Sequence, residues 1–264
     1  MPTDLQGLRR EIEALGPWFH NLHLPDGLQT APDHAYGDFP SFKWQHVAQA
    51  LPEDLRGWRV LDIGCNAGFY SIELARRGAT VLGIDVEPLY VRQARWAAAR
   101  FGLTDRLRFE EGEVYQLARA QCRFDLVWFT GVFYHLRYPT LALDLVRGVT
   151  AHLLMFQTMT MPGADALATP EDLPLDEREA LLDPGWPKMA FIEHRLANDA
   201  TNWWAPNHAC VEALLRSAGF EVVARPEHEF YLCRPVPEVP PADLERVLAI
   251  LDNAGPLGGL RPGR

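Results

Sequence analysis

Short apolar runs alternate with helical segments through the middle of this chain, and this alternation constrains its fold more than any other feature. Between Trp58 and Thr158 the apolar runs are RVLDIG, ATVLGID, RLRFEEG, FDLVWFTG and HLLMFQT. The stretches between them place apolar residues at helical spacing, as in AGFYSIELARRG and PLYVRQARWAAARFG. Strands that alternate with helices of this length predict βαβ units, and hence an α/β fold with an open, parallel sheet.

The sequence that follows predicts a different arrangement at one edge of this sheet. A helix is expected to begin at Asn207, which suits the N-cap position. Two further strands are expected at 220–225 and 228–234, close enough in sequence to form an antiparallel hairpin. Together with the five earlier strands, the hairpin gives a mostly parallel seven-stranded sheet with an antiparallel edge.

The remaining segments surround a main domain that is expected to span 55–234. Residues 1–54 predict an N-terminal amphipathic helix followed by an arm rich in aromatic residues. Residues 159–206 interrupt the alternation with six prolines. Because long structureless loops are uncommon in compact domains, we expect a lid or substrate insertion there. Residues 235–264 form a Pro/Gly-rich tail with one expected helix at 242–252.

Composition and charge limit the classes of function. The chain has 264 residues, 48% of them hydrophobic, so it can fold around a sizeable core. Its 25 basic and 35 acidic residues give a formal charge of −10, which offers no general attraction for nucleic acid or an acidic membrane. We therefore expect a small-molecule acceptor and no membrane partner. The cysteines have no CxxC spacing and no segment resembles a signal peptide or transmembrane span, which predicts a cytoplasmic location.

A turn of small residues follows the first predicted strand. In VLDIGCNAG, the residues Asp62, Gly64, Asn66 and Gly68 occur at the spacing D-x-G-x-N-x-G. Glycine permits positive φ angles and lets the backbone approach a ligand closely. The unpaired N–H groups at the N-terminus of the following helix can bind an anionic group of that ligand. The spacing differs from the G-x-G-x-x-G of dinucleotide-binding proteins and lacks the lysine of a phosphate-binding loop. The turn therefore predicts a nucleotide-like ligand in which phosphate is not the main recognised group.

Acidic residues end the next two predicted strands. Asp85 closes the second strand, where its carboxylate could accept hydrogen bonds from both ribose hydroxyls of an adenosine. Glu113 follows the third strand. Because the carboxyl ends of parallel strands face the ligand crevice in open α/β sheets, we expect these acids to share one site with the glycine turn.

These residues together resemble the class I S-adenosylmethionine-dependent methyltransferases, which have a Rossmann-like fold. The first motif of that class is similar to VLDIGCNAG, its second-strand acid is similar to Asp85, and its adenine loop is similar to EEGE. The resemblance implies S-adenosylmethionine as the cofactor, with its methionine moiety at the Gly64 turn. It also implies that Asp85 contacts the ribose with Val86 beside it, and that Glu113 and Val114 contact the adenine edge.

Two further motifs resemble one group within this class, the tRNA wobble-uridine carboxymethyltransferases and their relatives. The motifs are SFKW before the first strand and TGVFYH after the fourth. The resemblance implies that Lys43, Thr130 and Tyr134 lie at the sulfonium end of the cofactor. Members of this group use carboxy-S-adenosylmethionine, whose extra carboxylate needs cationic partners. The chain departs from the group at His20, where a lysine is usual, and offers only Arg234 as a candidate for a late arginine.

Tyr134 and His135 are the candidate catalytic residues, because an acceptor could approach the methyl group at the end of the fourth strand. His135 can act as a general base near neutral pH, or it can pack as a structural histidine that satisfies a backbone group. A sulfonium is already a strong electrophile, so alignment of the nucleophile could supply most of the rate without a base. Asp62 also has two interpretations, a hydrogen bond within the turn or a contact with the ligand.

The predicted lid carries the candidate acceptor-binding residues, which are His194, Asn202, Trp203 and Trp204. Tandem tryptophans beside an asparagine suit stacking on the apolar face of a sugar or on a base, with the amide bonding hydroxyls. The same tryptophans could instead anchor the lid to the core. The histidines of the chain show no metal-binding spacing, and no metal site is predicted.

The sequence thus favours methyl transfer from S-adenosylmethionine to a hydroxyl or similar nucleophile of a small polar acceptor, with a saccharide as one candidate. Two alternatives stay open. One is a tRNA wobble-uridine carboxymethyltransferase, which the SFKW and GVFYH motifs favour and the negative charge opposes. The other is a non-catalytic module that binds the cofactor or its product as a sensor or partner subunit.

Overall fold

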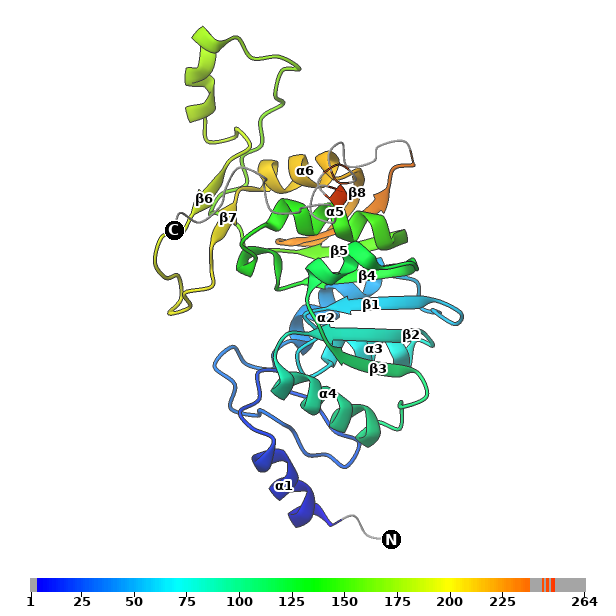
Figure 1. The fold of residues 1–264 in the computed structure, drawn as a ribbon. Helices are drawn as coiled ribbons and strands as arrows, with labels where there is room; N and C mark the ends of the chain where they lie inside the picture. Colours follow the sequence, from blue (N-terminus) through cyan, green and yellow to red (C-terminus); the bar gives the residue numbers. More distant parts are fainter. Residues whose placement is uncertain (1–3, 238–243, 245, 247, 250–264) are drawn as a thin grey trace, which may run out of the picture.

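A seven-stranded sheet forms the centre of the molecule. The computed structural model describes residues 4–237 together with 244, 246, 248 and 249 (Figure 1). The strand order is β3-β2-β1-β4-β5-β9-β8, with β1 to β5 parallel and β9 antiparallel to both of its neighbours. The strands are β1 Arg59–Ile63, β2 Thr80–Asp85, β3 Leu107–Glu111, β4 Phe124–Thr130, β5 Thr150–Gln157, β8 Phe220–Glu227 and β9 Phe230–Pro235. The predicted α/β class, with its antiparallel edge hairpin, is confirmed.

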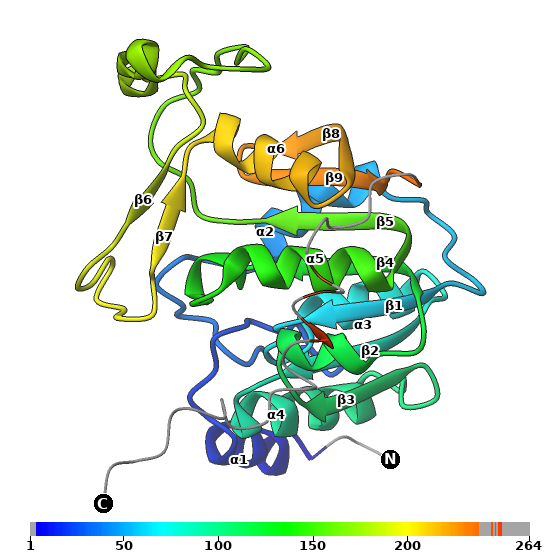
Figure 2. The same ribbon diagram turned by 45° about the horizontal axis from the view of Figure 1, so that its top comes forward.

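Helices cover both faces of this sheet (Figure 2). Helices α1 to α4 share one apolar core, and α5 and α6 share the core on the opposite face. The helices are α1 Leu5–Ala14, α2 Ser41–Val47, α3 Phe69–Arg76, α4 Pro88–Arg100, α5 Pro139–Val149 and α6 His208–Ser217, with 3₁₀ helices η1 Ala48–Ala50, η2 Val114–Arg119, η3 Phe133–His135 and η4 Leu175–Leu182. Between β3 and β4 the chain forms only the six-residue η2, not the α-helix that a complete alternating pattern predicts.

The strand order reverses direction beside the glycine turn. The chain proceeds outward from β1 to β3 and then returns to β4 on the other side of β1. Ligands of open α/β sheets bind outside the carboxyl ends of the strands at such a reversal. The central strands β1 and β4 are buried almost throughout, which explains why their sequences read as continuous apolar runs.

The N-terminal arm, residues 16–40, packs against α4. Gln93 of α4 is fully buried and donates through Nε2 to the carbonyl oxygen of Pro17 at 2.8 Å. The rings of Trp18 and Trp96 lie 5.5 Å apart, centre to centre. The arm is therefore part of the folded unit and not a linker.

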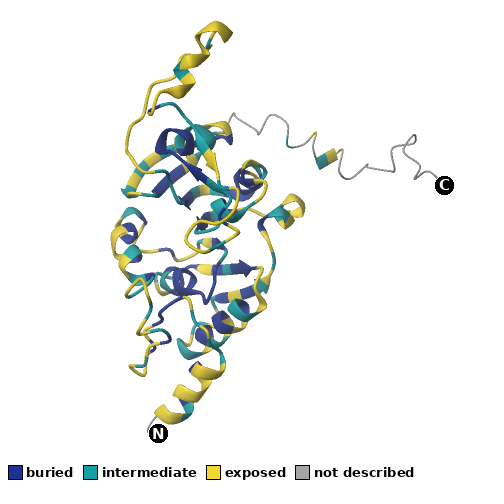
Figure 3. Ribbon diagram, turned by 90° about the vertical axis from the view of Figure 1, so that its left-hand side faces the viewer, coloured by how far each residue is buried: buried dark blue, intermediate teal, exposed yellow. Residues whose placement is uncertain are grey.

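Residues 159–206 leave the sheet between β5 and α6. They contain the hairpin of β6, Met189–Phe191, and β7, Trp204–Pro206, together with the 3₁₀ helix η4. Helix η4 has no buried residue and stands away from the sheet (Figure 3). Pro174 and Pro184 lie just outside its two ends, where proline prevents a longer helix. The insertion expected here thus contains a two-stranded hairpin and one exposed helical segment, and we call residues 159–206 the lid.

Few residues after the edge hairpin are described. Most of the tail expected at 235–264, including most of the helix expected at 242–252, lies outside the described residues. Among the residues that are described, no helix combines the length and the apolar character needed to cross a membrane.

Candidate active site

The turn between β1 and α3 depends on two glycines. Gly64 has a φ angle of 71° and Gly68 one of 84°. A Cβ atom on Gly64 would lie 2.3 Å from Cγ2 of Val132, and one on Gly68 would lie 2.9 Å from the ring of Phe109. Both positions therefore require glycine for backbone conformation and for space. Asn66, with a φ of 49°, is a third left-handed residue, and asparagine tolerates this conformation better than most side chains.

Asp85 joins this turn to the end of β2. Its Oδ2 accepts a hydrogen bond from the backbone N–H of Asn66 and its Oδ1 accepts one from Glu87, both at 2.9 Å. The residue is 8% exposed, and burial raises the pKa of the Asp85 carboxyl while the backbone donors act against that rise. Each carboxylate oxygen retains a second acceptor position, so ribose hydroxyls can still bind. Asp85 thus orders the glycine turn as well as being the ribose candidate.

Asp62 is held inside the protein. It is buried, and its Oδ2 accepts a hydrogen bond from the hydroxyl of Ser71 in α3 at 2.6 Å. Burial raises the pKa of Asp62 to about 7, although the hydrogen bonds from Ser71 oppose the rise. This contact ties β1 to the first turn of α3 and agrees with the structural interpretation of Asp62. A contact of Asp62 with the ligand stays a prediction.

The three residues predicted near the adenine differ in exposure. Glu113 is exposed and forms a capping box with Gln116, whose side chain accepts a hydrogen bond from the Glu113 N–H at 3.0 Å. Val114 is buried in the core. Val86 is 68% exposed directly after β2, which is unusual for a large apolar side chain. Of the three, Val86 is the residue whose apolar surface is open to a base.

The side chains predicted at the sulfonium end come from different elements. Thr130 ends β4 and accepts a hydrogen bond from Nε1 of Trp128 at 2.9 Å. Tyr134 lies in η3, and burial raises its pKa to about 12, so its hydroxyl stays protonated at neutral pH. The Lys43 ammonium lies 5.4 Å from the centre of the Phe39 ring, and burial lowers its pKa although nearby acids oppose that change. Tyr134 and Lys43 are both half-buried.

His135 contacts the lid. Its Nδ1 lies 2.8 Å from the hydroxyl oxygen of Thr201 and 3.9 Å from a carboxylate oxygen of Asp199. Burial lowers the pKa of His135 and the charge of Asp199 opposes this, so the imidazole is mainly neutral at pH 7. The tautomer in which Nδ1–H donates to Thr201 leaves Nε2 as a proton acceptor. The backbone N–H of Trp203 also donates to the carbonyl of Tyr134 at 2.8 Å, so both candidate catalytic residues are joined to the lid.

Two of the predicted acceptor residues have structural contacts. Trp204 is half-buried, and its Nε1 donates to the carbonyl of Leu136, outside the lid, at 3.0 Å. Asn202 is buried and donates through Nδ2 to the carbonyl of Leu196, within the lid, at 2.8 Å. The contact of Trp204 matches the anchoring alternative considered for the tandem tryptophans.

Trp203 has a different environment. Its ring stacks with that of Phe191 at 6.2 Å between centres, and the guanidinium of Arg137 lies 5.0 Å from the Trp203 ring and 5.5 Å from the Phe191 ring. We call Arg137, Phe191 and Trp203 the aromatic wall. His194, by contrast, has a side chain that is 85% exposed and lies 4.0 Å from the adjacent Glu193. The wall, whose two rings belong to the lid, therefore offers an organised surface to an acceptor.

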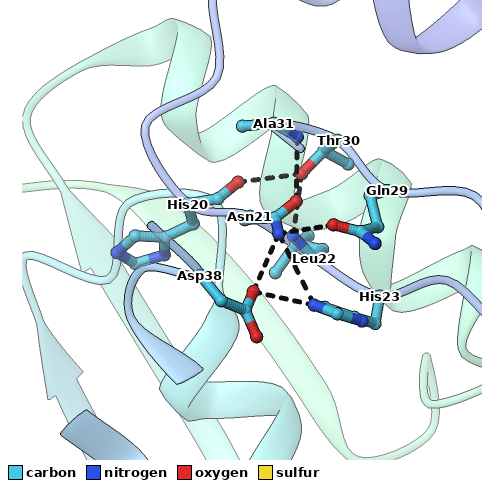
Figure 4. A network of polar contacts seen from close by, with 8 residues as sticks. All are labelled: His20, Asn21, Leu22, His23, Gln29, Thr30, Ala31 and Asp38. Carbon is cyan, nitrogen blue, oxygen red and sulfur yellow. Dashed lines mark hydrogen bonds and ion pairs between the residues drawn. The ribbon is translucent and has the colours of Figure 1, made fainter. Parts of the chain in front are cut away.

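The arm contributes a polar network that sequence reasoning did not find (Figure 4). Asn21 lies at its centre and donates through Nδ2 to the side-chain oxygens of Asp38 and Gln29, both at 2.8 Å. The hydroxyl of Thr30 donates to the carbonyl oxygen of His20, also at 2.8 Å. These hydrogen bonds fix the backbone of the arm on both sides of His20.

The ring of His20 leaves this network on the side away from Asn21 (Figure 4). It is 5% exposed and packs edge-on against Phe69 and Tyr70, the first residues of α3. Burial lowers the pKa of His20 to about 3, so the ring is neutral. Its Nδ1 is buried and has no hydrogen-bond partner among the described residues, which makes it available to a ligand atom. The one sequence feature that drew attention to His20 was its position where the tRNA enzymes have a lysine.

The acidic, histidine and cysteine side chains of the described residues do not converge on a metal site. In that part of the chain, no group of three or more His, Cys, Asp or Glu side chains is placed to hold a metal ion. The four cysteines are free thiols, and Cys122 is the exposed one.

Comparisons with known proteins agree with this geometry. The family model described as a methyltransferase domain matches residues 60–153, which run from β1 into β5. The tRNA U34 carboxymethyltransferase of Azotobacter vinelandii is 34% identical over 215 residues, covering 81% of this chain and 59% of that protein. That of Pseudomonas putida is 30% identical over 217 residues, covering 82% of this chain and 60% of that protein. The chain thus spans about three fifths of the length of these curated relatives.

Solved structures show the same fold. The N-terminal domain of EvdMO1, determined in the presence of SAH and D-fucose, has a TM-score of 0.61 at 21% identity and covers 89% of this chain and 97% of its own. The [4+2]-cyclase SpnF has a TM-score of 0.52 at 18% identity and covers 83% of this chain and 71% of its own. At these identities the likeness concerns the fold alone.

The strand order, the glycine turn, the acid after β2 and the matching domain model lead to one class. Residues 60–153 match a methyltransferase domain, and the chain has the fold of the class I S-adenosylmethionine-dependent methyltransferases. Its relatives include the tRNA U34 carboxymethyltransferases, the group that the SFKW and TGVFYH motifs resemble.

Proposed function

We propose that this protein transfers a methyl group from S-adenosylmethionine to a hydroxyl or similar nucleophile of a small polar acceptor, with saccharides as the first class to test. The observation that carries the proposal is the attachment of the lid to the sulfonium end of the site. Trp203 donates to the carbonyl of Tyr134, and Thr201 lies at hydrogen-bond distance from His135, both at 2.8 Å. An acceptor bound on the aromatic wall would therefore lie near Tyr134 and His135.

The residues at the sheet edge fit the cofactor. The glycine turn leads into the N-terminus of α3, whose backbone N–H groups suit the polar groups of the methionine moiety. Asp85 retains acceptor positions for the ribose, and the exposed Val86 offers apolar surface to the adenine. Bound there, S-adenosylmethionine would supply an electrophilic methyl group on its sulfonium. A neighbour of the same fold was determined with SAH, the product of that transfer.

His135 and Tyr134 have complementary protonation states for this reaction. Nε2 of His135 can take the proton that an acceptor hydroxyl loses as its oxygen bonds to the methyl carbon and the carbon–sulfur bond breaks. The lowered pKa of His135 keeps the imidazole in the basic form at neutral pH. The raised pKa of Tyr134 keeps its hydroxyl protonated, so it can donate a hydrogen bond to the acceptor.

The aromatic wall supports a saccharide or another ring-shaped acceptor. Tryptophan and phenylalanine faces pack well on the apolar face of a sugar, and a guanidinium can donate to its hydroxyls. The EvdMO1 domain, whose fold matches over most of this chain, was determined in the presence of D-fucose. Fold alone does not define a reaction, since the cyclase SpnF shares it, so the wall and His135 are the features to test.

A second candidate function is carboxymethyl transfer to the wobble uridine of tRNA. It is favoured by the 34% identity to a tRNA U34 carboxymethyltransferase and by the matching Lys43 and Tyr134. The charge of the lid opposes it. Residues 159–206 contain nine acidic and three basic side chains, a formal charge of −6, and such a surface repels the phosphate backbone of RNA.

A transfer assay separates these functions. The purified chain would be incubated with S-adenosylmethionine bearing an isotopically labelled methyl group and with monosaccharides, nucleotide sugars or unmodified tRNA in turn. Label in a sugar, located by mass spectrometry, supports the proposal. A parallel incubation replaces S-adenosylmethionine with its carboxylated form. Modification of tRNA only in that incubation supports the second candidate. Cofactor binding without transfer to any of these acceptors would favour the non-catalytic module.

A further inference from the structure

Glu229 places a fixed negative charge next to the carboxyl end of β5. It lies in the turn between β8 and β9, and its Oε1 accepts hydrogen bonds from the backbone N–H of Thr160 at 2.7 Å and from the Thr160 hydroxyl at 3.2 Å. Its Oε2 accepts a hydrogen bond from Nε2 of Gln157 at 3.1 Å. Gln157 is itself buried as the last residue of β5. Both oxygens of the carboxylate are therefore held in position.

A short chain of contacts connects Glu229 to Tyr134. The same Gln157 side chain accepts, through Oε1, a hydrogen bond from the backbone N–H of Gly131 at 2.8 Å. Gly131 faces the hydroxyl of Tyr134, since a Cβ built on Gly131 would lie 3.9 Å from that oxygen. Glu229 is thus linked through Gln157 to the end of β4, where the sulfonium is expected.

Lys43 approaches the same turn from α2. Its ammonium lies 5.9 Å from the ring centre of Phe230, the residue after Glu229. The charge of Glu229 acts on both predicted residues: it opposes the lowering of the Lys43 pKa by burial, and it adds to the rise that burial causes in the pKa of Tyr134. Lys43 also faces Glu227, whose carboxylate lies 3.5 Å from the His46 ring. Two carboxylates therefore face one ammonium.

We propose that Glu229 is a specificity-determining residue that makes the site select ordinary S-adenosylmethionine over its carboxylated form. This inference rests on the proposed function. A fixed carboxylate attracts a sulfonium cation, but it repels a second carboxylate carried on the transferable group. The repulsion is strong where water is largely excluded. The positive charge of Lys43 is already offset by Glu229 and Glu227, so Lys43 is poorly placed to compensate for the added charge.

Arg234 does not supply the missing cation. It is exposed near the far end of β9 and pairs in register with Glu221 of β8. The end of the hairpin that approaches Lys43 and Tyr134 instead carries Glu229. The edge hairpin therefore presents a negative charge to the sulfonium end of the site, where the group that uses the carboxylated cofactor needs positive charge.

Calorimetric titration of the full chain with S-adenosylmethionine and, separately, with carboxy-S-adenosylmethionine tests this assignment. The unmodified chain is expected to bind the ordinary cofactor more tightly. Glu229→Gln removes the charge with little change of shape and should lower the ratio of the two affinities by roughly tenfold or more. Glu229→Asp retains the charge and should retain the preference. Glu221→Gln, which removes the same charge from an exposed position on the same hairpin, should leave the ratio unchanged.

The outcomes separate this inference from the proposed function. An unchanged ratio in Glu229→Gln, or tighter binding of the carboxylated form by the unmodified chain, overturns the role of Glu229. Failure of the unmodified chain to bind either cofactor contradicts the proposed function instead. If Glu229→Gln does not fold, Lys43→Met provides the second measurement. Loss of that ammonium should strengthen the preference for the ordinary cofactor, and a shift towards the carboxylated form would overturn the inference.

Discussion

The carboxyl edge of the sheet and the lid hold their functional groups in different ways. At the sheet edge, Asp62 and Asp85 are buried and hydrogen-bond to a neighbouring helix and turn, and Thr130 is buried and hydrogen-bonds to Trp128 of its own strand. In the lid, η4 has no buried residue, and the hairpin is tied to the body through individual contacts such as those of Trp203 and Trp204. Strand topology determines the positions of the functional groups at the sheet edge, whereas a small number of side chains determines the position of the lid.

This difference suggests how the sheet edge and the lid can change independently of each other. A substitution at the glycine turn disturbs backbone geometry on which β1, β2 and α3 all depend, because Gly64 and Gly68 have no space for a side chain. A substitution on the aromatic wall changes an exposed surface at little cost to the fold. Acceptor choice can therefore vary on a constant cofactor site.

The largest expected effect lies where the two regions meet, at His135. If His135 is the base, His135→Ala should lower kcat by about 10²- to 10⁴-fold and leave cofactor affinity nearly unchanged. The rate of the unmodified protein should fall at acidic pH, because protonation of Nε2 removes the base. The midpoint should lie below the usual histidine value, since burial lowers the pKa of His135. Steady-state kinetics and the pH profile of kcat provide the measurement.

Thr201→Val is the matched control for His135. It removes the hydroxyl that lies 2.8 Å from Nδ1 but retains the imidazole, so its effect on kcat should be smaller. A normal rate in His135→Ala would make this histidine a packing residue and leave alignment as the main source of the rate.

The next largest effect tests the sheet edge. Asp85→Ala should weaken binding of S-adenosylmethionine by about 1.5–3 kcal/mol, the typical value of a lost hydrogen bond to a charged group. Asp62→Asn is the comparison, because the structure connects Asp62 to Ser71 and not to the open crevice. It should alter thermal stability more than affinity. Equal affinity of Asp85→Ala and the unmodified chain in calorimetry would show that the ribose binds elsewhere.

Much of the sheet could be predicted from the sequence. Strands buried on both faces keep continuous apolar runs, so the order of elements from β1 to β5 and the hairpin at 220–234 were recognisable. The segment after β3 was not predictable as a 3₁₀ helix. Its form depends on the capping box between Glu113 and Gln116 and on the few residues available before β4. The hairpin of the lid was also missed, since its strands have three residues each.

The site was predictable only in part, for a physical reason. Topology brings strand ends together, so the sequence pattern alone was enough to assign the glycine turn and Asp85 to one crevice. The importance of His20 and Glu229 depends on contacts that sequence patterns do not show. Glu229 is held by Gln157, 72 residues earlier in the chain, and His20 is notable because its Nδ1 is buried without a partner among the described residues.

A third prediction compares the two tryptophans of the lid. Trp203→Ala removes the central ring of the aromatic wall and should weaken acceptor binding by about tenfold, ~1.4 kcal/mol, with cofactor affinity unchanged. Trp204→Ala removes the indole that donates to Leu136 and should lower the melting temperature of the protein more than Trp203→Ala does. The acceptor KM and thermal melts of both variants provide the measurement. Equal effects of both variants on KM and on melting would show that the lid acts as one unit.

The smallest predicted effect concerns the arm and appears as a pH dependence. His20 is buried as a neutral ring with a pKa lowered to about 3, whereas a histidine in the unfolded chain titrates near 6.5. Below pH 6.5 the unfolded chain therefore binds this proton more readily than the folded one, and stability is lost as the pH falls from 6.5 towards 3. His20→Phe has no such proton to bind and removes an unpartnered polar atom, so its stability at pH 7 should be close to that of the unmodified protein.

Urea unfolding of both proteins at pH 7 and pH 5.5 measures the contribution of His20. Groups such as Asp62, whose raised pKa has the opposite effect on stability, are common to both proteins and cancel in the comparison. Relative to His20→Phe, the unmodified chain should lose about 1 kcal/mol of unfolding free energy over this interval. His194→Gln, at an exposed histidine of the lid, should follow the unmodified protein. If the unfolding free energies of the unmodified protein and His20→Phe change equally with pH, the His20 ring is reached by water or by a proton acceptor. The arm would then be held no more firmly than the lid.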